Sequence, residues 1–472
     1  MLGNINPDRK QKQILALSPK GHNVVLGTAG SGKTTMAIFR AIGLSNLPDN
    51  PKVLVVTFNQ ALVKYMSKLS GSDYNNLVVE SYHKFARGYL NSLGKMPFNC
   101  IADKDEKDKY ISEALLEIKT LYPEESTLKR PLNVFIDEIN FMQSFGIVDL
   151  DNYMNIERIG RASTNIRRDN RKWFFKVYER YLDIRNCNGK LYDWEDIAIS
   201  VYENLINDKR DRKYTHIIID EGQDFSPIML KSLVNAIPVN GSFTFFGDVS
   251  QQIYGSRLSW RNAGINVKDN PIWRFDANYR NPASVISFAK DITDMNIWQK
   301  DADMILPSKS IAEGPKPVLI HFSDSNKEVK WIIERIALDV GASSNVIIFR
   351  NRELLNNFAN ELKSNNIKYT IINHENTAYA GIKGIYLSTF HSAKGLEFDN
   401  VYIPMLSNNI IPDKEYICNC SSEEQGLFDE LKLLYVAVTR SRYGLFMSYY
   451  GDLSALFPSN SNNCVYYEEN EL

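Results

Sequence analysis

Cysteine is scarce in this 472-residue sequence, and long apolar runs are missing from it. A structural zinc site needs paired CxxC spacing, whereas these cysteines are scattered and offer only a lone CxC, so we expect free thiols. No run of about 18 uncharged apolar residues exists, and residues 1–12 contain no apolar signal core. These absences predict a reduced, cytoplasmic protein that does not bind a membrane. The cysteines are Cys100, Cys187, Cys418, Cys420 and Cys464.

An excess of charge of either sign is also missing, because 55 Lys and Arg residues nearly balance 56 Asp and Glu residues. Net charge therefore argues neither for nor against a polyanionic partner, and any surface that binds nucleic acid must be a local patch. The apolar fraction of 44% is ordinary for a globular protein. A chain of this length exceeds what one hydrophobic core usually serves, so we predict several domains.

Short apolar runs with strand character recur along the chain, each followed by a polar turn and a helical pattern. This alternation predicts an α/β fold in which helices cover parallel sheets. Residues 103–203 are instead charged, aromatic-rich and mostly helical in period, so we interpret them as a helical insertion in the first sheet domain. Pro271 and Pro282 accompany a change of pattern that indicates a second α/β unit. The expected strands are residues 23–26, 52–57, 216–219, 242–246, 345–349 and 384–389.

The most informative motif is GTAGSGKT at residues 27–34, which matches the phosphate-binding pattern GxxxxGK[ST]. It stands between the strand expected at 24–26 and a helix expected at 35–41, as the mechanism requires. Glycines let backbone N–H groups turn toward phosphates, and the helix N-terminus adds its positive dipole end. Lys33 is expected to reach the β- and γ-phosphates, and Thr34 to hold Mg²⁺. The expected nucleotide-binding residues are Gly27, Thr28, Ala29, Gly30, Ser31, Gly32, Lys33, Thr34 and Thr35.

A phosphate loop also needs an acidic residue at a strand end, to position the metal and activate water. Asp137 and Glu138 follow an apolar run inside the predicted insertion, and we interpret them as acidic first-turn residues of a helix. Asp220 and Glu221 follow the stronger run at 216–219, and another predicted strand comes after them. We therefore predict that Asp220 orders the metal and that Glu221 takes a proton from the attacking water.

Further motifs follow the phosphate-binding motif in a fixed order. They are VTFN at 56–59, SYH at 81–83, YDWED at 192–196, DEGQD at 220–224, GDVSQQIY at 247–254, NYR at 278–280, TFHSAKGLEF at 389–398 and LYVAVTR at 434–440. Each motif alone is weak evidence, but their common register over most of the chain is specific. The whole set resembles a superfamily 1 helicase of the UvrD/Rep/PcrA type.

The resemblance implies two RecA-like P-loop NTPase domains that hold one ATP between them. In such enzymes the second domain supplies arginines that stabilise the charge developing at the γ-phosphate. A glutamine near the N-terminus contacts adenine, and here Gln11 fits that position best, with Gln13 as the fallback. The other implied residues are Arg280 and Arg440 at the γ-phosphate, Gln251 as its sensor and Glu397 at the ribose.

The resemblance also divides the chain. Residues 1–102 and 204–275 correspond to domain 1A, residues 103–203 to a 1B-like helical insertion, and residues 276–472 to domain 2A. In the family a large accessory domain, 2B, is inserted between the NYR and GLE motifs. Only about a hundred residues separate these motifs here, which the core of domain 2A should consume, so we expect 2B to be absent or vestigial.

Contacts to a single strand of nucleic acid are implied at aromatic and polar residues of the same motifs. Ser256 departs from the family, which usually has a base-stacking tryptophan at that position. Trp260 could take over the stacking, but the sequence fits a tryptophan of the hydrophobic core at least as well. A basic cluster in the insertion suits either phosphate contacts or a solvated helix face. The implied contacts are Phe58, Asn59, Tyr82, His83, Tyr254, Arg257 and His391, and the cluster is Arg158, Arg161, Arg167, Arg168, Arg171 and Lys172.

The implied function is a DNA-dependent ATPase that moves 3′ to 5′ on single-stranded or partly duplex DNA, with ATP and Mg²⁺ as cofactors. An alternative is a nucleotide-gated DNA-binding or signalling subunit with little unwinding, and an RNA-directed motor stays open because the sequence does not address the 2′-OH. Short UvrD-like proteins resemble helicase components of anti-phage systems such as Gabija. A nuclease or another defence or repair protein is therefore an expected partner.

Overall fold

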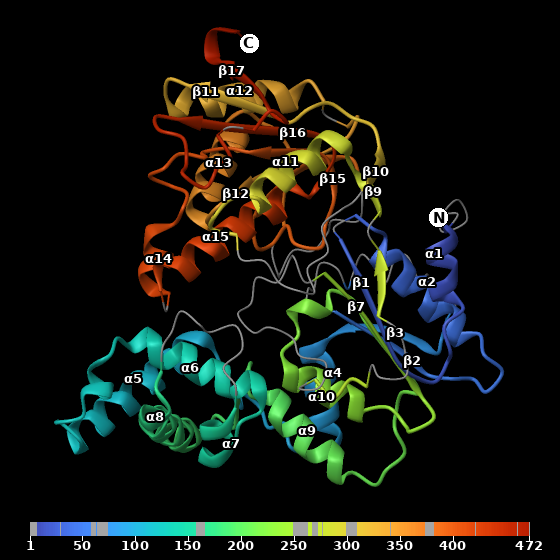
Figure 1. The fold of residues 1–472 in the computed structure, drawn as a ribbon, viewed down its shortest axis with the longest axis vertical. Coiled ribbons are helices and arrows are strands. Elements are labelled where there is room, and N and C mark those ends of the chain that lie inside the picture. Colours follow the sequence, from blue (N-terminus) through green and yellow to red (C-terminus); the bar gives the residue numbers. More distant parts are fainter. Residues whose placement is uncertain are drawn as a thin grey trace.

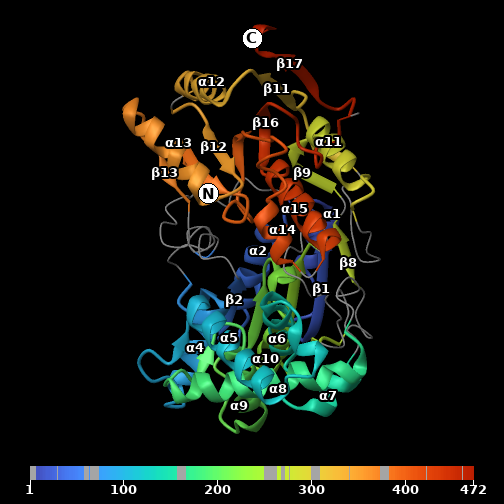
Figure 2. The same ribbon diagram turned by 90° about the vertical axis from the view of Figure 1, so that its left-hand side faces the viewer.

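The computed structural model consists of two α/β units and a group of helices (Figure 1). The helices lie to one side of the first unit, and the second unit lies beyond both, at the end that carries the C-terminus (Figures 1 and 2). In the described part of the chain, none of the helices has both the length and the apolarity that a membrane crossing requires. All five cysteines are free, as predicted. The structure describes residues 7–28, 30–57, 63, 74–156, 166–248, 263–266, 272–275, 277–298, 309–339, 341–372, 382–420, 422–459 and 461–471.

The first α/β unit contains a six-stranded sheet in the order β3-β2-β6-β7-β1-β8. All of its strand pairs are parallel, so the carboxyl ends of the strands share one edge. The inner strands are buried on both faces, which explains their continuous apolar sequences. The first four predicted strands are confirmed. The bounds are β1 Gly21–Gly27, β2 Val53–Thr57, β3 Leu77–Ser81, β6 His216–Ile219, β7 Ser242–Gly247 and β8 Trp273–Phe275.

Helices cover both faces of this sheet. Alternate residues of β2 point to opposite faces, so Val55 joins the core beneath α2 while Leu54 joins the core on the other side. The first core contains α1 (Arg9–Leu15) and α2 (Lys33–Ser45), and the second contains α4 (Tyr82–Ser92), α9 (Ile197–Asn207) and α10 (Pro227–Asn235). The helix expected after the GTAGSGKT motif is confirmed as α2.

The group of helices has a separate hydrophobic core, in which the rings of Phe135 and Phe174 stack with centroids 4.5 Å apart. Asp137 and Glu138 lie within α6, whose first turn contains no acidic residue. They are therefore helical, as interpreted, but the expected first-turn position is wrong. The elements are β4 Ile101–Ala102, α5 Lys104–Leu121, η2 Ser126–Lys129, α6 Leu132–Phe145, α7 Leu150–Asn155, α8 Arg168–Cys187 and β5 Tyr192–Asp193.

The second α/β unit contains a seven-stranded parallel sheet in the order β13-β14-β12-β15-β16-β11-β17. The strands predicted at 345–349 and 384–389 are confirmed as β12 and β14. The strand bounds are β11 Val318–Phe322, β12 Ser344–Phe349, β13 Thr370–Ile371, β14 Gly384–Thr389, β15 Phe398–Ile403, β16 Ser441–Tyr450 and β17 Val465–Glu468.

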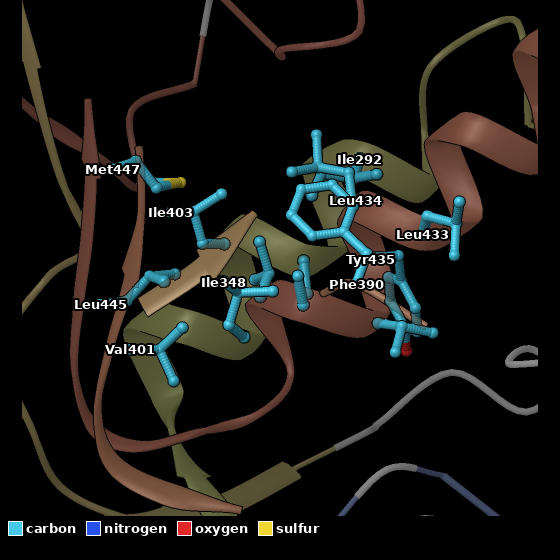
Figure 3. Packing of buried hydrophobic residues seen from close by; sticks show 14 of the residues in the cluster. Ile292, Ile348, Phe390, Val401, Ile403, Leu433, Leu434, Tyr435, Leu445 and Met447 are labelled. Atoms are coloured by element: carbon cyan, nitrogen blue, oxygen red, sulfur yellow. The ribbon is translucent and has the colours of Figure 1, made fainter. Parts of the chain in front are cut away.

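Helices cover this sheet too, and α15 runs through the middle of the larger of its two cores (Figure 3). There Leu434 and Tyr435 lie among side chains from the strands of the sheet, including Ile348 of β12 and Met447 of β16. The helices are α11 Ala283–Thr293, α12 Ser325–Ala337, α13 Arg352–Ser364, α14 Lys414–Asn419 and α15 Glu423–Val438, and the remaining elements are η3 Gly222–Asp224, η5 Glu469–Glu471 and the paired strands β9 Ala277–Pro282 and β10 Lys309–Ala312.

Candidate functional site

The loop of residues 27–34, called the phosphate loop below, joins β1 to α2 at the carboxyl edge of the first sheet. Gly30 and Gly32 have φ angles of +72° and +82°, which favour glycine. A Cβ atom at Gly27 would lie 2.6 Å from the Ser31 hydroxyl oxygen, so that position is also restricted to glycine. The N-cap residue of α2 is Gly32, which has no side chain to accept from the first N–H groups of the helix, so these groups can bind an anion.

Lys33 is buried, and its ammonium group donates hydrogen bonds to the carbonyl oxygens of Gly27 at 2.9 Å and Thr28 at 2.8 Å. A carboxylate oxygen of Asp248, at the end of β7, lies 3.9 Å from the same nitrogen. The positive charge is therefore held inside the loop, where phosphate oxygens would compete with the two carbonyl groups for it.

Thr34 donates a hydrogen bond from its hydroxyl to Oδ2 of Asp220 at 2.8 Å. The other carboxylate oxygen of Asp220, Oδ1, is buried and has no hydrogen-bond partner among the described residues. Burial and the adjacent Glu221 raise the pKa of Asp220 to about 7. A hydroxyl and an unsatisfied carboxylate oxygen are the hard oxygen donors that Mg²⁺ prefers, so these two residues fit the predicted metal.

Glu221 has a left-handed backbone conformation, with φ at 53°, which turns the chain sharply after β6. Its carboxylate accepts a hydrogen bond from the Gln223 amide at 2.5 Å. Burial opposes its ionisation, but the charges of Lys33 and Lys394 outweigh that effect and hold the pKa of Glu221 below its ordinary value. An ionised, buried carboxylate beside a phosphate loop can accept a proton.

The second unit contributes two arginines to this region. Arg280, in β9, donates to Glu397 at 2.7 Å. Arg440 is 1% exposed and donates to the carbonyl oxygens of Val436 at 2.8 Å and Leu396 at 3.3 Å. Burial and the charge of Arg280 lower the pKa of Arg440 to about 10, so it stays charged at neutral pH. The structure thus brings both predicted arginines and Glu397 to the phosphate-loop side of the second unit.

Two further groups touch the phosphate loop. The backbone N–H of Tyr279 donates to the carbonyl oxygen of Gly30 at 2.9 Å, so β9 of the second unit contacts the loop directly. Gln11 is buried and donates to the Ser31 carbonyl oxygen at 3.3 Å, whereas Gln13 is exposed. Of the two glutamines left open by the sequence, only Gln11 is placed at the loop. Sequence reasoning left Tyr279 without a role, although the NYR motif contains it.

Tyr82 occupies the hydrophobic core and has no exposed surface. Its hydroxyl lies 2.8 Å from the hydroxyl of Ser232, and its ring packs edge-on against Phe225. A ring without exposed surface cannot stack on a base, so the expected nucleic-acid contact at Tyr82 is wrong. The expectation came from the match to the family's aromatic contact positions, and a position in a motif does not report which residue of a helix turn faces inward.

The exposed aromatic side chain of Trp194 lies beside His83, the residue that follows Tyr82. The Nε2–H of His83 donates a hydrogen bond to the Trp194 carbonyl oxygen, 3.0 Å away, and the two rings meet at 81° with centroids 5.0 Å apart. Trp194 is 37% exposed. It belongs to the YDWED motif, and its type and position were the signal that sequence reasoning passed over. His391, on the second unit, is partly buried, and burial together with nearby cations lowers its pKa to about 4.

The basic cluster of the insertion does not form one surface. Arg171 is buried, and its guanidinium donates to the carbonyl oxygens of Tyr153 at 2.6 Å and Ile156 at 3.0 Å, which ties α8 to the end of α7. Arg167, Arg168 and Lys172 are exposed. Several predicted residues lie outside the described residues: Ala29, Phe58, Asn59, Gln251, Tyr254, Arg257, and with them Arg158, Arg161, Ser256 and Trp260.

The geometry defines the class of protein as a P-loop NTPase with two parallel-sheet units, in which charged residues of both units meet at one phosphate loop. Models of known protein families identify the family within this class. The UvrD/REP helicase N-terminal domain matches residues 8–270, and the UvrD-like helicase C-terminal domain matches residues 273–380 and 373–452. The chain belongs to the UvrD/REP helicase family, which confirms the predicted superfamily, the predicted fold class and the prediction of an enzyme of the helicase class.

Three relatives illustrate the similarity. A probable DNA helicase of Mycoplasma pneumoniae is 25% identical over 468 residues, covering 93% of this chain and 82% of the relative. The ATP-dependent DNA helicase srs2 of Schizosaccharomyces pombe is 24% identical, covering 73% of this chain and 41% of the relative. DNA helicase II of Haemophilus influenzae is 26% identical, covering 63% of this chain and 41% of the relative. The chain therefore spans less than half the length of the last two.

Proposed function

We propose that the chain hydrolyses ATP to move along single-stranded DNA, 3′ to 5′, and that it can separate DNA strands. One observation carries the proposal: carboxylates of the first unit and arginines of the second face the same phosphate loop. Asp220 and Glu221 follow β6, whereas Arg280 belongs to β9 and Arg440 lies between α15 and β16. A site divided in this way is complete only when the two units are close, so hydrolysis and domain movement are linked.

Each residue has a defined part in this chemistry. Lys33 and the N–H groups at the start of α2 bind the phosphates, and Thr34 with Asp220 would hold Mg²⁺, which supplies charge neutralisation at the phosphates when bound. Glu221 accepts the proton of the attacking water. Arg440 and Arg280 stabilise the charge that develops on the transferred phosphoryl group. Gln11, which donates to the Ser31 carbonyl oxygen, is proposed to contact the adenine, and Gln251 to sense the γ-phosphate.

The same division accounts for movement along DNA. Closure of the two units around ATP and reopening after hydrolysis would shift one unit relative to the other on the strand. The DNA contacts proposed here are Trp194, His83 and His391 among the described residues, together with Phe58, Asn59, Tyr254 and Arg257 from the motifs. We propose domain boundaries at 1–102 and 204–275 for the first unit, 103–203 for the helical insertion and 276–472 for the second unit. The boundary at residue 203 falls within α9, which packs in the core of the first unit.

The alternative is a nucleotide-gated subunit of a larger defence or repair complex that unwinds little by itself. One observation favours it. Between Pro282 and Gly384 the described residues form α11, β10, β11, α12, β12, α13 and β13, and apolar side chains of all of these except β10 enter the cores of the second sheet. This supports the absence of domain 2B, and it leaves a nuclease or another protein as a proposed partner.

The deciding experiment measures ATP hydrolysis with and without single-stranded DNA, followed by strand separation on duplexes with a 3′ overhang, a 5′ overhang or blunt ends. Hydrolysis stimulated by DNA and separation of the 3′-overhang duplex support the motor. Equal hydrolysis rates with and without DNA would refute it. DNA-stimulated hydrolysis without strand separation supports the gated subunit. If RNA stimulates hydrolysis as strongly as DNA does, the substrate class extends to RNA.

A further inference from the structure

Asp224 and Lys394 form a buried ion pair between the two α/β units. Asp224 ends η3, in the turn that follows β6 of the first unit, and Lys394 lies in the loop between β14 and β15 of the second. Their side chains are 5% and 7% exposed. A charge is stable in a buried position only beside its partner, so the ion pair favours the arrangement in which the two units are close together in this region.

Each partner is joined to a residue of the proposed chemistry by a short path. On the first unit, the N–H of Asp224 donates to the carbonyl oxygen of Glu221 at 3.0 Å, and Gln223 between them holds the Glu221 carboxylate. The amide oxygen of Gln223 also accepts from the N–H of Asp248 at 2.7 Å. These hydrogen bonds hold the turn that contains Glu221 in one conformation, and Asp224 is the last residue of that turn.

On the second unit, Lys394 shares its loop with two residues that touch the arginines. The carbonyl oxygen of Leu396 accepts from Arg440 at 3.3 Å, and the carboxylate of Glu397 accepts from Arg280 at 2.7 Å. A displacement of this loop would move both acceptors, and with them the two guanidinium groups. The sequence separations are 170 for the ion pair and 117 for Arg280 and Glu397, so no local structure substitutes for these contacts.

We propose that the Asp224–Lys394 ion pair sets the position of the arginines of the second unit relative to Glu221 of the first, which makes Lys394 a positioning residue for hydrolysis. This inference rests on the proposed ATPase function. Lys394 need not touch the nucleotide in this role: it fixes the loop whose next residues hold Arg440 and Arg280. Small misplacements of catalytic groups reduce rates strongly, so loss of the pair should reduce kcat more than it changes KM.

The test compares Lys394→Met, Asp224→Asn and the double variant in the full chain, with Lys327→Met as the control. Lys327 forms an exposed ion pair with Glu469 on the same unit, 2.8 Å long and far from the phosphate loop in sequence. Each single variant should lower the melting temperature, because it leaves one buried charge unpaired, and should lower kcat for ATP roughly tenfold or more with a smaller change in KM. The double variant removes both charges, so its melting temperature should recover.

The double variant distinguishes positioning from stability, because its kcat should stay low when its stability returns. Small-angle X-ray scattering without nucleotide gives a second readout, in which the singles should have a larger radius of gyration than the wild type and the Lys327→Met control. Recovery of kcat together with stability, or unchanged kcat in the singles, would overturn the inference. If a single variant fails to fold, the double variant decides alone. An inactive wild type would instead refute the proposed function.

Discussion

The hydroxyl of Thr34 donates a hydrogen bond to the Asp220 carboxylate at 2.8 Å, although 186 positions separate the two residues in the sequence. The contact joins the start of α2 to the end of β6 across β7, which lies between β6 and β1 in the sheet. Because all these strands are parallel, their carboxyl ends meet at one edge, where open α/β sheets bind ligands. The predicted metal-binding residues are therefore neighbours only as a consequence of the sheet order.

Lys33→Ala should abolish ATP hydrolysis, because no other cation in the described part of the first unit lies inside the phosphate loop. Steady-state phosphate release measures this directly. Lys20→Ala is the matched control, since Lys20 is exposed just before β1. Hydrolysis that persists in Lys33→Ala at the wild-type rate would remove the phosphate loop from the proposed site.

Glu221→Gln should stop turnover while nucleotide binding remains. The amide keeps the shape of the side chain, but it cannot accept the proton of the attacking water. Binding of a fluorescent ATP analogue and phosphate release should therefore separate, with binding within a few-fold of the wild type. Glu203→Gln, at an exposed position of α9, serves as the control. A variant that turns over normally would show that another residue is the base.

Trp194→Ala should weaken binding of single-stranded DNA by roughly tenfold or more, which corresponds to the loss of about one stacked base. Tyr82→Phe should leave that affinity unchanged, because the ring stays in the core and only the hydrogen bond to Ser232 is lost. Its cost should instead be about 1 kcal/mol of folding stability. Fluorescence anisotropy with labelled DNA and thermal melting separate the two effects; the opposite pattern would place Tyr82 on the DNA.

Acid should destabilise the chain partly through His391. Burial and nearby cations lower its pKa to about 4 in the folded protein, from an ordinary value of 6.5. Below pH 6.5 the unfolded chain therefore binds a proton that the folded chain does not, so stability is complete above pH 6.5 and falls toward pH 4. The loss at pH 5 is about 2 kcal/mol.

The measurement is the free energy of unfolding between pH 5 and pH 7.5. In His391→Asn the acid loss should shrink by that amount, whatever the variant does to stability at neutral pH. His321→Asn, a partly exposed histidine on the same unit, is the control. An unchanged pH slope in His391→Asn would mean that this imidazole is protonated alike in the folded and unfolded chains.

Local patterns determined most of the fold. The phosphate loop needs only a strand, glycines and a helix within a few residues of one another, and the inner strands are recognisable because burial on both faces makes them continuously apolar. Asp220 and Glu221 could be chosen over Asp137 and Glu138 because the apolar run before them is stronger and another predicted strand follows them. These properties depend on neighbours in sequence, so the sequence alone contains them.

Only the tertiary structure decided which side chains face outward and which distant residues meet. Tyr82 and Trp194 are both aromatic residues in helicase motifs, yet Tyr82 packs against Phe225 in the core and has no exposed surface, whereas Trp194 is 37% exposed. Arg171 looked like part of a basic surface, but the end of α7 supplies carbonyl groups that hold it inside. The Asp224–Lys394 pair joins residues 170 positions apart, and such contacts arise from the packing of whole units, which no local pattern encodes.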